Sequence, residues 1–166
     1  KIKDGFLKMI SEAKRNVYIE TPYFIPDDSI NEALRLASLS GLDVRIMIPS
    51  KPDHSFVYWA SMSYVGELLE AGVRFFAYEG GFLHSKVVIT DDFVSSVGTT
   101  NLDIRSFKLN FEVNAFIYDK DVNLRLTEKF LEDLENSKEI TIDSYKKRSA
   151  IIKIKESIFR LLSPLL

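Results

Sequence analysis

Residues 81–101 read GFLHSKVVITDDFVSSVGTTN, two strand-like runs that meet at Asp91 and Asp92. The runs KVVIT and FVSSVG are rich in β-branched residues and predict a strand hairpin. His84 and Lys86 lie two positions apart, so on a strand both side chains would project from one face, about 7 Å apart. A His and a Lys on one face of a buried strand cost free energy unless a site uses them. The hairpin therefore predicts a sheet that carries a site of phosphate size.

Helical and strand-like segments alternate on either side of the hairpin. The predicted helices cover 5–16, 29–40, 55–71 and 122–137, and the other predicted strands cover 17–20, 43–49, 73–79 and 110–119. We expect the second helix to begin after an N-cap of Asp28 or Ser29, and the last after Asp119 or Asp121. Such alternation is typical of an α/β fold in which helices cover a sheet.

The composition limits the class of protein. A chain of 166 residues, 46% of them hydrophobic, is long enough for one well-filled core. A formal charge of -2 argues against a generic nucleic-acid coat, and we expect no nucleic-acid partner. The absence of cysteine excludes disulfides, thiolate catalysis and cysteine-ligated metals. No apolar run reaches the roughly 18 residues that a membrane-spanning helix needs.

Charge is distributed unevenly along the chain. From residue 145 to the end, six basic residues face one acid, Glu156, so this segment is strongly positive while the rest is negative. We expect a catalytic half-domain at 1–145 and a basic amphipathic tail at 146–166. The tail carries an apolar stripe opposite a polar face of Lys153, Glu156, Ser157 and Arg160, and the stripe consists of Ile151, Ile154, Ile158, Leu161 and Leu165. Two roles fit this tail: lying on anionic lipid, or packing onto the domain or a partner chain.

The polar residues of the hairpin suit phosphodiester chemistry. A neutral imidazole such as His84 can attack phosphorus, and a charged one can protonate a leaving oxygen. Lys86 and Asn101 can hold phosphoryl oxygens as charge builds, with Thr99 as a further neutral donor. Asp91 can steady either Lys86 or neighbouring backbone N–H groups. This chemistry needs neither a metal nor a cofactor, and we expect none.

The spacing of these residues matches H-x-K-x4-D-x6-G-[ST]-x-N, and the chain thereby resembles the phospholipase D superfamily. Longer stretches resemble the carboxy-terminal half of bacterial cardiolipin synthases: TPYFIPD, PSKPDHSFVYWA, YVGELLEAGVRFFAYEGGFLHSK, VGTTNLDIRSFKLNFEVNAFIYD and RLLSPLL. The resemblance implies a phospholipase D-like α/β domain, with a mixed sheet covered by helices on both faces and a C-terminal amphipathic helix. It departs from the family at Thr99, where Ser is commoner, but the hydroxyl is kept.

Enzymes of this family use two copies of the motif that face each other, and this chain has one. The second histidine, His54, is followed by Ser and Phe and has no Lys two positions on. The resemblance therefore implies half an active site, completed by the amino-terminal half of the same enzyme or by a homodimer mate. The chain also begins at Lys1, without Met or a signal peptide, which favours a piece of a longer protein.

By resemblance, the reaction joins two phosphatidylglycerol molecules into cardiolipin and glycerol through a phosphatidyl-histidine, at the cytoplasmic face of the cell membrane. The implied catalytic residues are His84, Lys86 and Asp91, and the implied phosphate ligands are Lys86, Thr99 and Asn101. His84 is either nucleophile or general acid, with acid slightly favoured. Two alternatives remain open: a phospholipase D or phosphodiesterase that uses water, and a non-catalytic membrane-binding or dimerisation fragment.

Four further residues are candidates for the site. The resemblance implies that Glu112 orients a motif histidine, and the alternative is an outward-facing strand charge. Tyr23 either lines the phosphate or glycerol pocket or packs in the core. His54 either contacts a lipid headgroup or belongs to a solvated turn. Arg105 either forms an internal salt bridge or meets a second phosphate.

Overall fold

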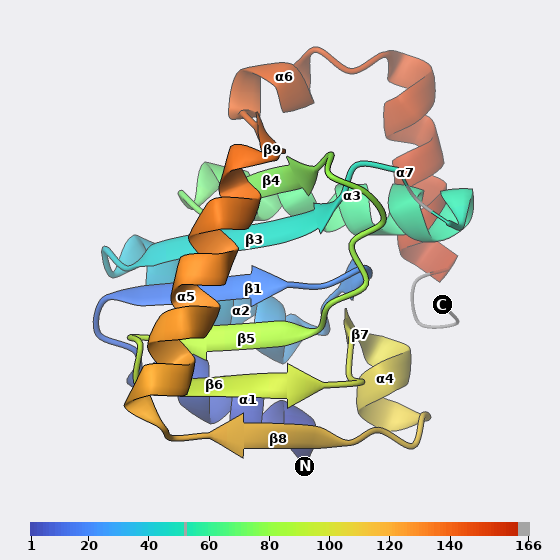
Figure 1. Cartoon of the computed structure of the whole chain (residues 1–166). Helices are drawn as coiled ribbons and strands as arrows, with labels where there is room; N and C mark the ends of the chain where they lie inside the picture. Colours follow the sequence, from blue (N-terminus) through green and yellow to red (C-terminus); the bar gives the residue numbers. More distant parts are fainter. Residues whose placement is uncertain (52, 163–166) are drawn as a thin grey trace.

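A seven-stranded mixed sheet runs through the computed structural model, which describes residues 1–51 and 53–162 (Figure 1). The strand order is β8-β6-β5-β1-β3-β4-β9. The neighbours β1, β3 and β4 are parallel, and the other pairs are antiparallel. The strands span β1 Asn16–Glu20, β3 Asp43–Pro49, β4 Arg74–Tyr78, β5 Val87–Thr90, β6 Val94–Gly98, β8 Asn114–Ile117 and β9 Ser137–Ile140.

Helices cover both faces of this sheet, as predicted. On one face lie α1 (Ile2–Glu12), α2 (Asp28–Leu39) and α3 (Ser55–Glu70), whose apolar residues share one core with the sheet. On the other face, α5 (Lys120–Glu135) crosses the strands (Figure 1). A second, smaller core lies beneath it, around Phe130.

The period of two in β1 sorts its side chains between these cores. Val17 and Ile19 belong to the core shared with α1, α2 and α3. Tyr18 points to the other face and stacks on Phe130 of α5, with ring centroids 4.8 Å apart. The same alternation along β5 sends Val88 to the first core and Ile89 to the second.

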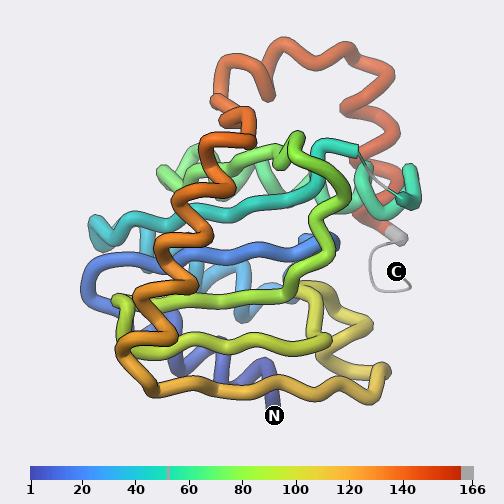
Figure 2. Tube along the Cα trace, viewed as in Figure 1, coloured from blue at the N-terminus to red at the C-terminus, as the bar shows by residue number. Residues whose placement is uncertain are grey.

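Several short elements escaped the sequence analysis because they are too short to show a period. The two-residue strands β2 (Phe24–Ile25) and β7 (Leu102–Asp103) pair in parallel and tie together segments far apart in the chain. The one-turn helices α4 (Ile104–Lys108) and α6 (Ile142–Lys146) were also not predicted, nor was β9. Figure 2 shows that residues 79–86 and 98–113 lie at the same end of the strands, on the right in this view.

Some predicted boundaries were wrong. The N-cap of α2 is Asp27, whose carboxylate accepts the N–H of Ile30 at 3.1 Å, and not Asp28 or Ser29. For α5 the cap is Asp119, one of the two predicted residues. The strand expected over 110–119 is confined to Asn114–Ile117, and residues 110–113 precede it as a loop. The first helix lies over Ile2–Glu12 and not over 5–16, with Ala13 as its C-cap.

The basic tail forms α7 (Ala150–Leu162), which packs on α3 (Figure 1). Beside this contact, the Tyr145 hydroxyl donates to the carbonyl of Met62 at 2.7 Å. One alternative for the tail, packing onto the domain, is therefore observed, while the division at residue 145 stays a prediction. Leu165 of the expected stripe lies outside the described residues. Within those residues, every helix is too short or too polar to span a bilayer.

Candidate active site

His84 and Lys86 lie in the irregular segment just before β5. The Lys86 carbonyl accepts the N–H of Gly98 at 3.3 Å, so the contact between the two hairpin strands continues to this point. The Lys86 ammonium donates to the carbonyl oxygen of His84 at 2.7 Å. The exposed imidazole of His84 stacks on Phe82, with centroids 5.7 Å apart and planes at 29°. The imidazole of His84 is thus accessible, and the ammonium of Lys86 lies beside its backbone.

Gly98 allows two segments to approach closely at the end of β6. A Cβ at this position would lie 2.3 Å from the carbonyl oxygen of Val113, closer than any side chain can come. The bare α-carbon lets Thr99 and Val113 pair: the Thr99 N–H donates to the Val113 carbonyl at 2.9 Å. In return, the Val113 N–H donates to the Thr99 hydroxyl oxygen at 3.0 Å. The motif glycine therefore fixes the loop that carries Glu112.

Glu112 is held by its neighbours in this loop. Its carboxylate accepts a hydrogen bond from the Thr99 hydroxyl and another from the Asn110 amide at 3.2 Å. Within the described residues it makes no bond to His84. The histidine-orienting role of Glu112 remains a prediction, as does phosphate binding by Thr99, whose hydroxyl donates to this carboxylate in the structure.

A hollow of about 320 Å³ opens beside these residues and brings together four of the predicted site residues. Tyr23 and His54 contribute from the segments that follow β1 and β3, and Asn101 and Arg105 from the segment that follows β6. The full lining is Tyr23, Ile25, His54, Phe56, Val57, Asn101, Asp103, Arg105 and Asn110. Apolar and polar groups thus share one concave surface, as in most small-molecule sites.

Acidic side chains surround Lys86. Burial lowers the pKa of its ammonium, and the negative charges of Glu112, Asp103 and Asp53 act in the opposite direction. Asp103 is buried, and this burial raises the pKa of its carboxyl despite hydrogen bonds from Ser106 and the Asn101 side chain. The Ser106 N–H donates to Asp103 at 2.5 Å, which caps α4. Burial has the larger effect on Lys86, so the pKa of its ammonium lies below the ordinary value, and the three carboxylates limit this decrease.

Two polar groups at the site have features that matter for ligand binding. The Oδ1 atom of Asn101 is buried and has no hydrogen-bond partner in the part of the chain that the structure describes. Such an acceptor normally has a donor in protein, water or ligand. Arg105 donates from Nε to Asn110 at 3.4 Å and forms no ion pair within residues 1–51 and 53–162. Its exposed guanidinium is available to an anion.

Tyr23 and His54 meet at Asp53. The Tyr23 hydroxyl donates to the Asp53 carboxylate, and burial together with this bond raises the pKa of Tyr23 to about 12. The backbone N–H of His54 donates to the same carboxylate at 2.8 Å. The His54 ring stacks on Phe56, with ring centroids 5.5 Å apart. Tyr23 therefore lines the hollow as a neutral hydroxyl, and His54 stands at the start of α3.

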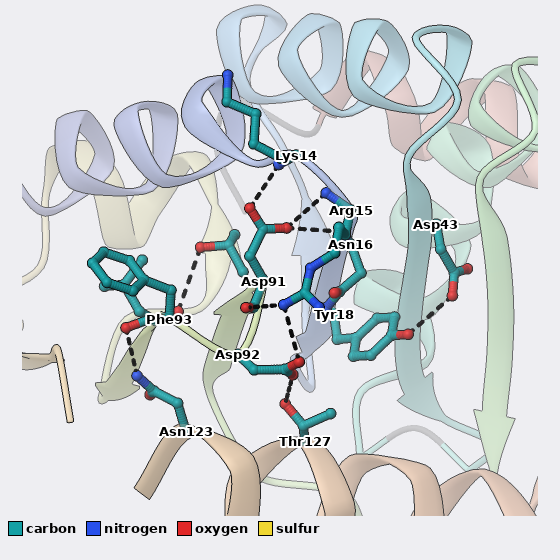
Figure 3. A network of polar contacts seen from close by, with 12 residues as sticks. Lys14, Arg15, Asn16, Tyr18, Asp43, Asp91, Asp92, Phe93, Asn123 and Thr127 are labelled. Atoms are coloured by element: carbon teal, nitrogen blue, oxygen red, sulfur yellow. Dashed lines mark hydrogen bonds and ion pairs between the residues drawn. The ribbon is translucent and has the colours of Figure 1, made fainter. Parts of the chain in front are cut away.

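Asp91 lies apart from the other motif residues, at the opposite end of β5. Figure 3 shows it beside Lys14, Arg15 and Asn16. Asp91 lies five positions after Lys86 along an extended chain, which corresponds to about 16 Å. Its carboxylate accepts the backbone N–H groups of Lys14, Arg15 and Asn16 at 2.6, 2.8 and 3.0 Å. The structure thus shows Asp91 in one of its two predicted arrangements, binding backbone N–H groups and not Lys86.

The sequence analysis missed Asp53, Asp103 and Asn110. A signal for Asp103 was present, because Asp followed by Ser three residues later is a helix N-cap pattern. Asp103 also lies two positions after Asn101, and both line the hollow. For Asp53 and Asn110 the sequence carried no comparable signal, since their roles depend on contacts with Tyr23 and Glu112.

The family described as "Cardiolipin synthase, PLD-like domain" matches residues 6–134, most of the chain. The chain belongs to this family. Among curated cardiolipin synthases it is 58% identical over 165 residues to the "Major cardiolipin synthase ClsA" of Bacillus subtilis. It is 54% identical over 165 residues to the cardiolipin synthase of Listeria monocytogenes. In both cases the match covers 99% of this chain but 34% of the relative, so the chain spans about a third of the length of these cardiolipin synthases.

Solved structures show the fold at lower identity. The phospholipase D family member Nuc from Salmonella typhimurium matches with a TM-score of 0.72 and 20% identity, over 84% of this chain and 90% of that one. The phosphatidylserine synthase of Haemophilus influenzae matches with a TM-score of 0.77 and 15% identity, over all of this chain and 45% of that one. The cardiolipin synthase domain therefore has the phospholipase D fold predicted from its motif.

Proposed function

We propose that the chain supplies one of the two motifs of a cardiolipin synthase, which transfers a phosphatidyl group between two phosphatidylglycerol molecules. One motif histidine bonds to phosphorus while the bond from phosphorus to the glycerol oxygen breaks, and the other motif histidine protonates that oxygen. A hydroxyl oxygen of the second phosphatidylglycerol then bonds to phosphorus and its proton returns to this histidine, while the bond between phosphorus and the first histidine breaks. The products are cardiolipin and glycerol, and no metal or cofactor takes part.

The side chains around the hollow have matching roles in this proposal. His84 is the nucleophile or the general acid, and its exposed ring is accessible to a lipid headgroup. Lys86 has three N–H donors, of which one is used on the His84 carbonyl, leaving two for phosphoryl oxygens. Arg105 supplies further donors from the wall of the hollow, and Tyr23, whose hydroxyl hydrogen goes to Asp53, lines the same wall. Asn101 lies on the same hollow and is the proposed second phosphate ligand.

The charges support a site completed by a second motif. Three carboxylates, Asp53, Asp103 and Glu112, act on Lys86, and Arg105 is a further cation, on the hollow. Three acids against two bases cannot by themselves neutralise a phosphodiester as well. A facing histidine and lysine would supply the missing positive charge.

Exposed apolar residues beside Glu112 support the same conclusion. The loop before β8 carries Leu109, Phe111 and Val113, which are 71%, 107% and 71% exposed. Large apolar side chains gathered this way next to a site typically mark contact with another protein surface. We propose that the rest of the longer enzyme, or a second copy of this chain, covers them.

The observation that carries the proposal is the accessible His84 beside Lys86, in a chain that belongs to the cardiolipin synthase family. The test is to supply vesicles of labelled phosphatidylglycerol to this chain alone, and to the chain combined with the amino-terminal part of a family member. Cardiolipin formed only by the combination would support the proposal. A combined sample with His84→Ala serves as the control and should form none.

Three other results would each contradict a different part of the proposal. Phosphatidic acid in place of cardiolipin would show a hydrolase that uses water as acceptor. Turnover by this chain alone would show that two copies pair their motifs about a two-fold axis. No turnover in any combination would favour a binding or dimerisation module. The proposed location is the cytoplasmic face of the cell membrane, and the absence of nucleic-acid binding remains a prediction.

A further inference from the structure

Helix α7 has an inner face, which packs on α3, and an outer face. On the inner face Glu156 is 4% exposed and pairs with Arg148 at 2.7 Å. Lys155 lies over the Trp59 ring at 5.5 Å, at the edge of this contact. Packing on α3 therefore buries one side of the helix and determines which side faces away from the domain.

The outer face of α7 carries an uncovered apolar stripe. Ile151, Ile154, Ile158 and Leu161 are 69%, 60%, 52% and 82% exposed. Their spacing of three, four and three residues keeps them within about 80° of the helix circumference. Four large apolar side chains in one continuous exposed line are unusual on a soluble surface and mark an interaction site.

The charge around this stripe identifies its partner. Lys153 and Lys155 flank the stripe on its two sides, and neither has a carboxylate partner within the described residues. From residue 145 to 162 the sequence has six basic residues and one acid, Glu156. Lys146, Arg148 and Arg160 pair with Glu70, Glu156 and Glu67, so the uncompensated charge within the described residues is that of Lys147, Lys153 and Lys155. Two such helices laid against each other would bring like charges together, whereas an anionic surface would attract both lysines.

We propose that the outer stripe of α7 docks on an anionic lipid bilayer. The four apolar side chains enter the boundary between headgroups and acyl chains, and the lysine stems extend so that their ammonium groups reach the lipid phosphates. The choice of lipid as partner rests on the proposed function, whose substrates are anionic lipids. Helix α3 links the two surfaces, because its first turn lines the hollow and its length carries α7 (Figure 1).

Vesicle co-sedimentation of this chain tests the proposal without any turnover. The vesicles contain either phosphatidylcholine alone or equal parts of phosphatidylcholine and phosphatidylglycerol. We expect binding to the mixed vesicles, weakened by salt. Ile154→Glu with Ile158→Glu should bind at least about tenfold more weakly. Lys153→Gln with Lys155→Gln should lose about fivefold per lysine.

Matched controls separate this surface from general effects. Leu36→Glu with Leu39→Glu alters two residues of α2 that are 50% and 58% exposed, and should bind as the unmodified chain does. Because the chain has no cysteine, Ile158→Cys accepts a single polarity-sensitive fluorophore. Its emission should shift to the blue with mixed vesicles, while the same label on Leu39→Cys should not respond. This second measurement keeps the test decisive if a Glu variant fails to fold.

Three results would overturn the proposal: equal binding by the stripe variant, no preference for phosphatidylglycerol, or a stripe variant that alters self-association and not vesicle binding. The last would make the stripe an interface between chains. Transfer by the complete enzyme is measured separately. Loss of transfer with intact docking would contradict only the proposed function, and transfer without docking only this inference.

Discussion

The ammonium of Lys86 donates a hydrogen bond to the main-chain carbonyl of His84 at 2.7 Å. One side chain thus steadies the segment that carries the imidazole and keeps two N–H donors free for a substrate. It does so among the negative charges of Glu112, Asp103 and Asp53, which favour its charged form against the effect of burial. The two residues that the motif spaces two apart are therefore coupled through the backbone.

Lys86→Met should abolish this coupling and the binding of phosphoryl oxygens. We expect transfer by the complete enzyme to fall at least about 100-fold, mainly in kcat, because charge on the phosphoryl group grows in the transition state. Steady-state kinetics on phosphatidylglycerol vesicles measure this fall in the rate of transfer. Lys138→Met, at an exposed position on β9, is the matched control and should keep its rate. Activity of Lys86→Met within about twofold of the unmodified enzyme would contradict the assignment.

Thr99 gives a second prediction, because its hydroxyl both accepts the Val113 N–H at 3.0 Å and donates to Glu112. Thr99→Ser keeps both bonds and should transfer at nearly the original rate. Thr99→Val leaves the Glu112 carboxylate without this donor, and we expect transfer to fall about tenfold with about 1 kcal/mol less stability. Parallel measurements of turnover and urea unfolding check both effects. Equal rates for the two variants would show that the hydroxyl does not position Glu112 for the reaction.

Much of this arrangement could be predicted from the sequence, because period and turn chemistry are local signals. The hairpin at Asp91 and Asp92 is an example: both residues have positive φ, 58° and 54°, as a two-residue turn requires. The motif spacing also predicts that Lys86 and Asn101 belong to one site, and this stays a prediction. Glu112 was placed on a strand in error, since the loop at 110–113 forms only because Thr99 pairs with Val113.

Long-range contacts explain what the sequence could not predict. The hydrogen bond between Tyr23 and Asp53 joins residues 30 apart, and no local pattern predicts it. The exposed stripe of α7 was predicted from its helical spacing, but its coexistence with a second face packed on α3 follows only from the contact near Trp59. Local patterns thus located most elements, and tertiary packing decided which polar side chains meet.

Gly98→Ala should be strongly destabilising. The added Cβ would lie 2.3 Å from the Val113 carbonyl oxygen, a backbone atom that cannot move without breaking the pairing of Thr99 with Val113. We expect a loss of about 2–3 kcal/mol in the free energy of unfolding, measured by urea titration. Gly41→Ala is the comparison, because Gly41 has φ 90° with open space around it, and its cost of about 1 kcal/mol comes from backbone strain alone. A smaller loss at Gly98 than at Gly41 would contradict the close approach.

Asp91→Ala should separate a structural role from a catalytic one. The variant loses the acceptor for three backbone N–H groups, and we expect about 1–2 kcal/mol less stability at neutral pH. Because Asp91 lies at the far end of β5 from Lys86, transfer per folded molecule should stay within about threefold. Glu128→Ala, which changes an exposed carboxylate on α5, is the control and should alter neither quantity. A loss of transfer in fully folded Asp91→Ala would assign Asp91 to the reaction.

The pH dependence of this difference supplies the sharper test. Burial alone would raise the pKa of the Asp91 carboxyl, but hydrogen bonds from the N–H groups of Asn16, Lys14 and Arg15 outweigh it and hold the pKa below its ordinary value. A carboxyl whose pKa is lower in the folded state stabilises the protein fully above its unfolded pKa of about 3.9. That stabilisation disappears as the pH falls through the lowered folded value. The unfolding free energies of the unmodified chain and Asp91→Ala should therefore differ by a constant amount from pH 5 to 7 and converge below about pH 4. A difference that persists unchanged at low pH would show that the carboxylate charge is not what binds these N–H groups.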